Sequence, residues 1–114
     1  MCIRDRLEFA EDVPVCPERL AAALQNDPAI THVAAVYCET TSGILNPLPR
    51  LAAVTAAHGR ALLVDAMSAF GALPLDAREI AFEAAVASSN KCLEGVPGMG
   101  FCICLLYTSD AADE

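Results

Sequence analysis

Three short apolar segments constrain the fold of this chain more than any other feature of its sequence. They cover residues 32–37 (HVAAVY), 61–64 (ALLV) and 82–87 (FEAAVA). Largely continuous apolar runs of this length, without regular polar alternation, are typical of strands that are buried on both faces of a parallel sheet. The sequence therefore predicts three buried strands.

Two further segments carry the spacing of a helix. Residues 17–24 (PERLAAAL) place Pro at the first turn and Leu and Ala at helical intervals, and residues 46–57 do the same before Gly59. Residues 7–9 and 99–102 are additional candidate strands, the second joined to the third apolar segment by a turn rich in Gly and Pro. Strands that alternate with helices predict an α/β fold with a mainly parallel sheet.

Both ends of the chain resemble a translated sequencing adapter. The chain ends in CLLYTSDAAD and begins with MCIRD. One choice of codons for the ending has a first part whose reverse complement encodes the beginning. A single inverted repeat of the transposase-adapter type therefore accounts for both ends. We therefore interpret residues 1–6 and 104–114 as adapter-derived scars and exclude them from the fold. Residues 7–103 are then expected to be an incomplete domain of a larger protein.

Composition and charge exclude several classes of function. A chain of 114 residues suits one domain, and 55% hydrophobic residues indicate a globular protein. The net charge of -8 disfavours nucleic acid as a partner. The chain has no apolar run long enough to span a membrane and no signal peptide, so we expect a cytoplasmic protein. The six cysteines lack metal-ligand spacing, and we interpret them as reduced thiols with no metal site.

Polar residues follow each of the three predicted strands. They form the groups 39–43 (ETTSG), 65–68 (DAMS) and 88–91 (SSNK). Because right-handed crossovers bring the carboxyl ends of parallel strands to one edge, where ligands bind, we expect these groups to meet there. Each residue alone is more often a cap, a turn residue or a solvated surface group. An amine, a carboxylate and several hydroxyls on one edge indicate a narrower chemistry.

This set of groups matches the needs of pyridoxal phosphate. An amine bonds to an aldehyde only when it is unprotonated, and partial desolvation among small residues favours that state of a lysine. A buried aspartate stabilises the protonated ring nitrogen of the cofactor. Hydroxyls and backbone amides at strand ends suit the ring oxygen and the phosphate. The sequence therefore predicts a pyridoxal phosphate site.

Three segments carry a resemblance to a known family. They are YCETTSGILNP (37–47), LLVDAMSAFGALPLD (62–76) and VASSNKCLEGVPGMGF (86–101). In this order and spacing the chain resembles the 2-aminoethylphosphonate–pyruvate transaminases, which belong to the class V branch of the fold-type I pyridoxal phosphate aminotransferases. The resemblance covers nearly all of residues 7–103. It implies a partial three-layer α/β sandwich that is part of the large cofactor-binding domain.

The resemblance also implies two catalytic residues, Lys91 and Asp65. Lys91 would bond to the cofactor aldehyde and then act as the base that moves a proton between the substrate Cα and C4′ of the cofactor. Asp65 would pair with the pyridine nitrogen. Both residues would therefore bind the cofactor as well as take part in the reaction.

Four more cofactor contacts are implied by the resemblance. Thr40 would lie near the ring oxygen, Met67 against one face of the ring, and Asn90 and Ser88 near the phosphate. Core filling explains Met67 equally well. One departure concerns Tyr37, because the family usually has His directly before the Cys-Glu-Thr-Thr run. This departure bears on the substrate side of the site rather than on the cofactor contacts.

The activity implied by the resemblance is transfer of the amino group of 2-aminoethylphosphonate to pyruvate, giving phosphonoacetaldehyde and L-alanine. A homodimer is implied as well, with essential parts outside residues 7–103, so we expect the isolated chain to be inactive. Another class V transaminase, such as an alanine–glyoxylate or serine–pyruvate aminotransferase, is the first alternative. A second is a non-enzymatic α/β module in which Lys91 and Asp65 merely pair. A third is that the chain is an assembly artefact without a function of its own.

Overall fold

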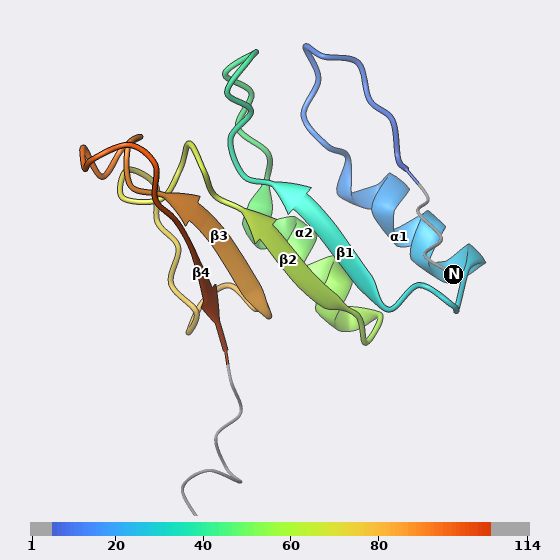
Figure 1. Cartoon of the computed structure of the whole chain (residues 1–114). Helices are drawn as coiled ribbons and strands as arrows, with labels where there is room; N and C mark the ends of the chain where they lie inside the picture. The colour runs from blue at the N-terminus through green and yellow to red at the C-terminus, as the bar shows by residue number, and fades with distance from the viewer. Residues whose placement is uncertain (1–5, 106–114) are drawn as a thin grey trace, which may run out of the picture.

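The computed structural model describes residues 6–105, which contain two helices and four strands (Figure 1). In chain order these are α1 (Pro17–Asn26), β1 (His32–Val36), α2 (Leu48–Ala57), β2 (Ala61–Asp65), β3 (Ala84–Ser88) and β4 (Gly100–Cys104). Residues 1–5 and 106–114, which make up most of the two segments interpreted as adapter-derived (1–6 and 104–114), lie outside the described residues. Cys104, which that interpretation excluded from the fold, is the last residue of β4. Neither described helix is long and apolar enough to cross a membrane.

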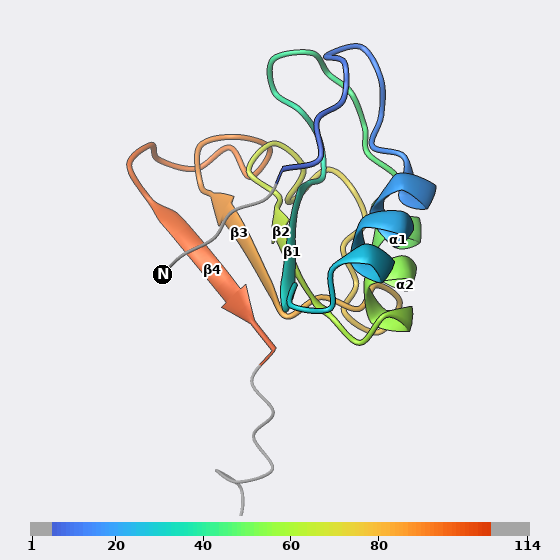
Figure 2. The same cartoon turned by 90° about the vertical axis from the view of Figure 1, so that its right-hand side faces the viewer.

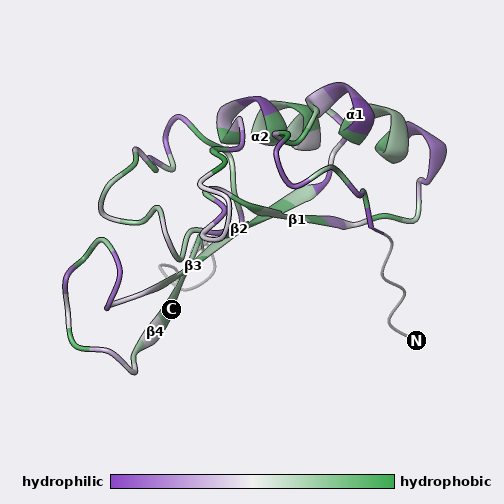
Figure 3. Cartoon of the chain, turned by 90° about the horizontal axis from the view of Figure 1, so that it is seen from above, coloured by the Kyte–Doolittle hydropathy of each residue, from purple (hydrophilic) through white to green (hydrophobic). Residues whose placement is uncertain are grey.

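The strands form one sheet in the order β1-β2-β3-β4, in which β1, β2 and β3 are parallel and β4 is antiparallel to β3. Each parallel pair needs a crossover, and α2 supplies the one from β1 to β2. Both helices lie on the same face of the sheet (Figure 2, Figure 3). The prediction of an α/β fold with a mainly parallel sheet is confirmed.

The two helices pack on each other through leucines. α1 begins at Pro17, whose missing N–H costs nothing at the first helical position. Leu20 and Leu24 lie one turn apart on its buried face and form a cluster with Leu51 of α2. Each fully buried leucine contributes about 1.5–3 kcal/mol of transfer free energy. This contact fixes α1 to α2, and α2 in turn covers the sheet.

The face of the sheet that points away from the helices is largely exposed, so the prediction of strands that are buried on both faces is wrong. In β2, Leu62 and Val64 are 2% exposed on the helix face, whereas Leu63 between them is 36% exposed. Val86 of β3 lies on the same open face and is 40% exposed. The described residues therefore supply two layers, the sheet and the helices, of the three-layer sandwich that the resemblance implies.

The limits of three predicted strands also differ from the structure. Residues 7–9 form no strand; the Phe9 ring lies instead 4.4 Å from the guanidinium carbon of Arg19. β3 begins two residues later than predicted, because Phe82 is a core residue, 7% exposed, that does not pair with β2. β4 is likewise shifted toward the C-terminus and covers Gly100–Cys104.

Asn46 fixes the segment that leaves β1. Its side chain is 3% exposed; its Oδ1 accepts the N–H of Val15 at 2.9 Å, and its Nδ2 donates to the carbonyl of Val36 at 2.8 Å. The neighbouring Tyr37 is 7% exposed, and its hydroxyl donates to the carbonyl of Pro74 at 2.9 Å. These bonds tie the end of β1 to the segments that precede α1 and follow β2.

Candidate active site

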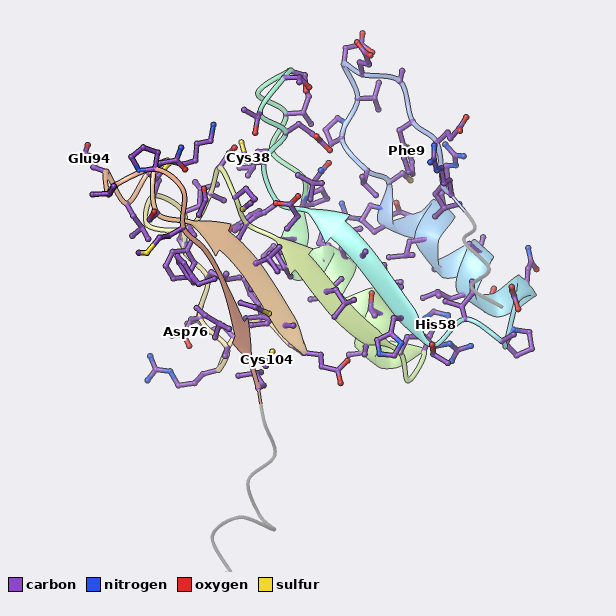
Figure 4. The ribbon with its side chains drawn as sticks, viewed as in Figure 1. Phe9, Cys38, His58, Asp76, Glu94 and Cys104 are labelled. Carbon is purple, nitrogen blue, oxygen red and sulfur yellow. The ribbon has the colours of Figure 1, made fainter. Side chains whose placement is uncertain are left out.

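The loops that follow β1, β2 and β3 leave the sheet at one edge, which we call the carboxyl edge (Figure 1). Thr40 lies in the first loop, Asp65 directly precedes the second and Lys91 lies in the third. In Figure 4, Cys38 and Glu94 mark this edge, whereas His58 lies at the opposite edge. The three polar segments that were expected to share an edge therefore do share it.

Asp65 is the last residue of β2, and its register partners are Val36 of β1 and Val86 of β3. Its side chain is half-buried, and its Oδ1 accepts the backbone N–H of Met67 at 3.0 Å. Within the described residues this carboxylate forms no ion pair, and its second oxygen has no hydrogen-bond partner. The central position in the sheet thus holds a carboxylate with one oxygen free for a ligand.

Lys91 lies in the turn between β3 and β4, and its side chain is exposed. The turn is closed by its own backbone: Glu94 N–H donates to the carbonyl of Lys91 at 2.9 Å, and Gly95 N–H donates to that of Ser89 at 2.7 Å. The expected partial desolvation of Lys91 is therefore wrong for the described chain. Lys91 pairs with neither Asp65 nor any other described acid, which removes the support for a module in which these two residues merely pair.

Ser88 is the last residue of β3 and is 9% exposed. Its Oγ is buried and has no hydrogen-bond partner among the described residues. The register places Ser88 on the same face of the sheet as Asp65. A buried hydroxyl without a partner costs about 1–3 kcal/mol, a cost that a polar ligand would relieve. The other two predicted contacts, Asn90 and Met67, are exposed at the carboxyl edge.

Ser68 connects the three loops. Its Oγ is hydrogen-bonded to Oγ1 of Thr40, and its carbonyl accepts the thiol of Cys92 at 3.4 Å. Cys92 is the residue after Lys91. From the sequence we expected Ser68 at this edge but predicted no function for it, because a serine three residues after the end of a strand is a common turn residue. Only the contacts between loops distinguish it.

A cavity of about 790 Å³ lies away from these groups, between residues 6–9, α1 and β1. Its lining includes Leu20, Leu24 and Leu51, but neither Asp65 nor Lys91. Because β1 is at the edge of the sheet, the cavity runs beside a strand with one unpaired side. Because neither Asp65 nor Lys91 lines it, the cavity does not mark the candidate active site.

The groups at the carboxyl edge fit pyridoxal phosphate. They include the exposed amine of Lys91, the half-buried carboxylate of Asp65 with one free oxygen, and the buried Ser88 hydroxyl that lacks a described partner. An amine, an acid and a hydroxyl are the groups that an aldehyde, a ring nitrogen and a phosphate require.

The chain belongs to the class V aminotransferase family, which its sequence matches over residues 5–113. Relatives from Pseudomonas putida and Pseudomonas entomophila, both named 2-aminoethylphosphonate–pyruvate transaminase, are 63% and 62% identical to it over 94 residues. The solved pyridoxamine–pyruvate aminotransferase from Mesorhizobium loti superposes on 87% of the chain with a TM-score of 0.81 and 31% identity. The resemblance stated from the sequence is confirmed.

These matches cover unequal shares of the two chains. The two relatives align with 82% of this chain but with 26% of their own length, and the solved structure is covered to 25%. The chain thus spans about a quarter of the length of the relatives it matches. The fold of the described residues is that of the fold-type I aminotransferases, and the cofactor that this family implies is pyridoxal phosphate.

Proposed function

We propose that this chain is part of a pyridoxal phosphate-dependent transaminase that moves the amino group of 2-aminoethylphosphonate to pyruvate, giving phosphonoacetaldehyde and L-alanine. The observation that carries the proposal is that Asp65 ends β2 and Lys91 follows the neighbouring parallel strand β3, both at the carboxyl edge of the sheet. The choice of substrates is supported by the names of the two Pseudomonas relatives.

Asp65 and Lys91 are proposed to act on the cofactor at the carboxyl edge. Pyridoxal phosphate supplies an aldehyde that takes up an amino group and a ring that accepts the electron pair released at the adjacent carbon. Lys91 would hold the cofactor at its aldehyde carbon through Nζ, which no described acid engages, with release of the aldehyde oxygen as water. The same Nζ would later carry the proton between substrate and cofactor carbons. Asp65 would accept the ring-nitrogen proton of the cofactor in a hydrogen bond to its free oxygen, while the Met67 N–H keeps the carboxylate oriented.

The remaining contacts are proposed for the phosphate and the ring. Ser88 and Asn90 donate hydrogen bonds to the phosphate, which is supported by the buried Ser88 hydroxyl that has no described partner. Thr40 would lie near the ring oxygen. Met67, 38% exposed at the edge, packs against one face of the ring, as its soft thioether allows.

A second candidate is a class V transaminase with an α-amino acid donor, such as an alanine–glyoxylate or serine–pyruvate aminotransferase. The lysine and the aspartate serve either reaction, because each of these donors presents a primary amine on a carbon that carries a hydrogen. Tyr37 does not separate the two candidates. Its buried hydroxyl is bonded to Pro74, which favours a structural role for this departure from the family.

The test uses a grafted enzyme, in which the 94 aligned residues of the Pseudomonas putida relative are replaced by those of this chain. The protein is incubated with pyridoxal phosphate, reduced with borohydride and digested, and the peptide that contains Lys91 is weighed. We expect a pyridoxyl group on Lys91, its absence in Lys91→Ala, and normal labelling in the neighbouring control Glu94→Gln. An unlabelled Lys91 in the unsubstituted protein would refute the enzymatic proposal.

The donor is identified in the same grafted enzyme. Formation of alanine from pyruvate should occur with 2-aminoethylphosphonate and stop in Lys91→Ala. Turnover with serine as the donor and pyruvate as the acceptor, or with alanine as the donor and glyoxylate as the acceptor, and none with the phosphonate, would select the second candidate instead. In the isolated chain Lys91 is the only lysine, so its labelling needs to be distinguished only from that of the N-terminal amine; there we expect no transamination.

A homodimer and a cytoplasmic location complete the proposal. The homodimer is supported by the family resemblance. The cytoplasmic location is supported by the described cysteines, all of which are free thiols, as in a reducing compartment. They are Cys16, Cys38, Cys92, Cys102 and Cys104.

A further inference from the structure

The turn that follows Asp65 is anchored in the core on both sides of Ser68. Ala66 and Ala69 are 0% and 1% exposed, and the N–H groups of Ala69 and Phe70 donate to the carbonyl of Ala66 at 3.1 and 2.9 Å. Ser68 stands between these buried alanines. Its position is therefore set by the packing of the core.

The loop that carries Thr40 depends on this anchored turn. Thr40 is exposed, in a turn that is closed by a hydrogen bond from Gly43 N–H to the carbonyl of Glu39 at 2.8 Å. Within the described residues, the partner of its side chain is Oγ of Ser68. The position of the Thr40 hydroxyl therefore depends on its hydrogen bond to Ser68.

The turn that carries Lys91 rests on the same segment at two points. The Cys92 thiol donates to the carbonyl of Ser68 at 3.4 Å. Leu93 packs over Gly71 so closely that a Cβ on Gly71 would lie 2.9 Å from its Cδ2. Because Cys92 and Leu93 directly follow Lys91, a shift of the turn after Asp65 is passed on to the lysine.

We propose that Ser68 is a positioning residue of the candidate active site, which sets the Thr40 hydroxyl and the Lys91 turn relative to each other. The inference rests on the proposed function, since it concerns a cofactor bound between these loops. In a pair of hydroxyls one group donates and the other accepts. When Ser68 donates, the O–H of Thr40 is free to donate to the ring oxygen of the cofactor, and this bond favours the anionic oxygen.

The test titrates the absorbance of the cofactor bound to Lys91 against pH in the grafted enzyme. Ser68→Ala should raise the midpoint by about half to one pH unit, which corresponds to one neutral hydrogen bond. Ser68→Thr keeps a hydroxyl and should stay closer to the unsubstituted protein. Ser42→Ala is the matched control, because the Ser42 hydroxyl lies in the Thr40 loop but contacts the N–H of Ile44 at 3.4 Å. Its midpoint should not move.

A second variant keeps the test decisive even if Ser68→Ala does not fold. Thr40→Val removes the donor itself from an exposed position and should give a rise at least as large, with no further rise in the double variant. An unchanged midpoint in Ser68→Ala or in Thr40→Val would overturn the positioning role while Lys91 is still labelled. Loss of the label from the unsubstituted grafted enzyme would instead overturn the proposed function.

Discussion

Replacing Gly95 with alanine should displace the turn that carries Lys91. A Cβ on Gly95 would lie 2.8 Å from the carbonyl oxygen of Ser89 and 3.3 Å from its Cβ. The same oxygen accepts the Gly95 N–H at 2.7 Å, so it cannot move away without losing the bond that closes the turn. The added methyl group therefore has to shift the turn as a whole, together with the lysine.

Gly100 provides a matched control for this substitution. A Cβ there would meet the carbonyl oxygen of Ala87 at 3.7 Å, an ordinary contact. Neither Gly95 nor Gly100 has a positive φ, so alanine should stabilise both sites by about 0.4–1 kcal/mol through the unfolded state. Overpacking adds a cost of about 1–3 kcal/mol at Gly95 alone. The two variants should thus differ by about 1–3 kcal/mol.

Two measurements check this expectation. Urea denaturation of the chain should give Gly95→Ala a lower free energy of unfolding than the unsubstituted protein, and Gly100→Ala an equal or higher one. Borohydride labelling of Lys91 in the grafted enzyme should be slower in Gly95→Ala and unchanged in Gly100→Ala. Equal free energies of unfolding for the two variants would refute the steric reasoning.

Three further substitutions test the supports of the site. Asn46→Ala leaves two buried backbone groups unpaired and should lower the free energy of unfolding by about 2–4 kcal/mol in urea denaturation. Tyr37→Phe leaves the carbonyl of Pro74 without its donor and should cost about 1–2 kcal/mol in the same assay; no loss would argue against the bond. The Cys16 thiol, and to a lesser degree Arg50, lowers the pKa of the Glu18 carboxyl. The stability that Glu18 contributes is therefore present above its unfolded-state pKa and lost as the pH falls through its lower folded-state pKa; Glu18→Gln should flatten this part of a melting-temperature profile.

Element types were predictable from the sequence because they depend on local composition. The runs that became β1 and β2 are apolar and bounded by turns, and the run that became α1 has helical spacing after Pro17. The sequence did not show which face of the sheet the helices cover. Leu62 and Leu63 are equally hydrophobic, yet only Leu62 lies under a helix. The prediction that Phe82 begins a strand was wrong for a related reason, since a residue can be buried in the core without pairing in the sheet.

The candidate active site, too, was predictable from the sequence only in part. Asp65 and Lys91 were placed at one edge because parallel strands share a direction, which the order of elements alone provides. The exposure of Lys91 was not predictable, because small neighbours in the sequence do not guarantee cover in space. The link between Thr40 and Ser68 joins residues 28 positions apart, so only the three-dimensional arrangement reveals it.

The antiparallel pairing of β3 with β4 has a consequence for the order in which the site assembles. A hairpin closes locally and forms in roughly 1–10 μs, whereas a parallel pair has to wait for its crossover to be arranged. Lys91 lies inside this hairpin, but Asp65 joins it only through the parallel pair of β2 with β3. We therefore expect the lysine turn to be shaped early during folding and the acid to arrive late. The cofactor would then bind at a late stage of folding, after the hairpin has formed, and would not be needed for the hairpin to form.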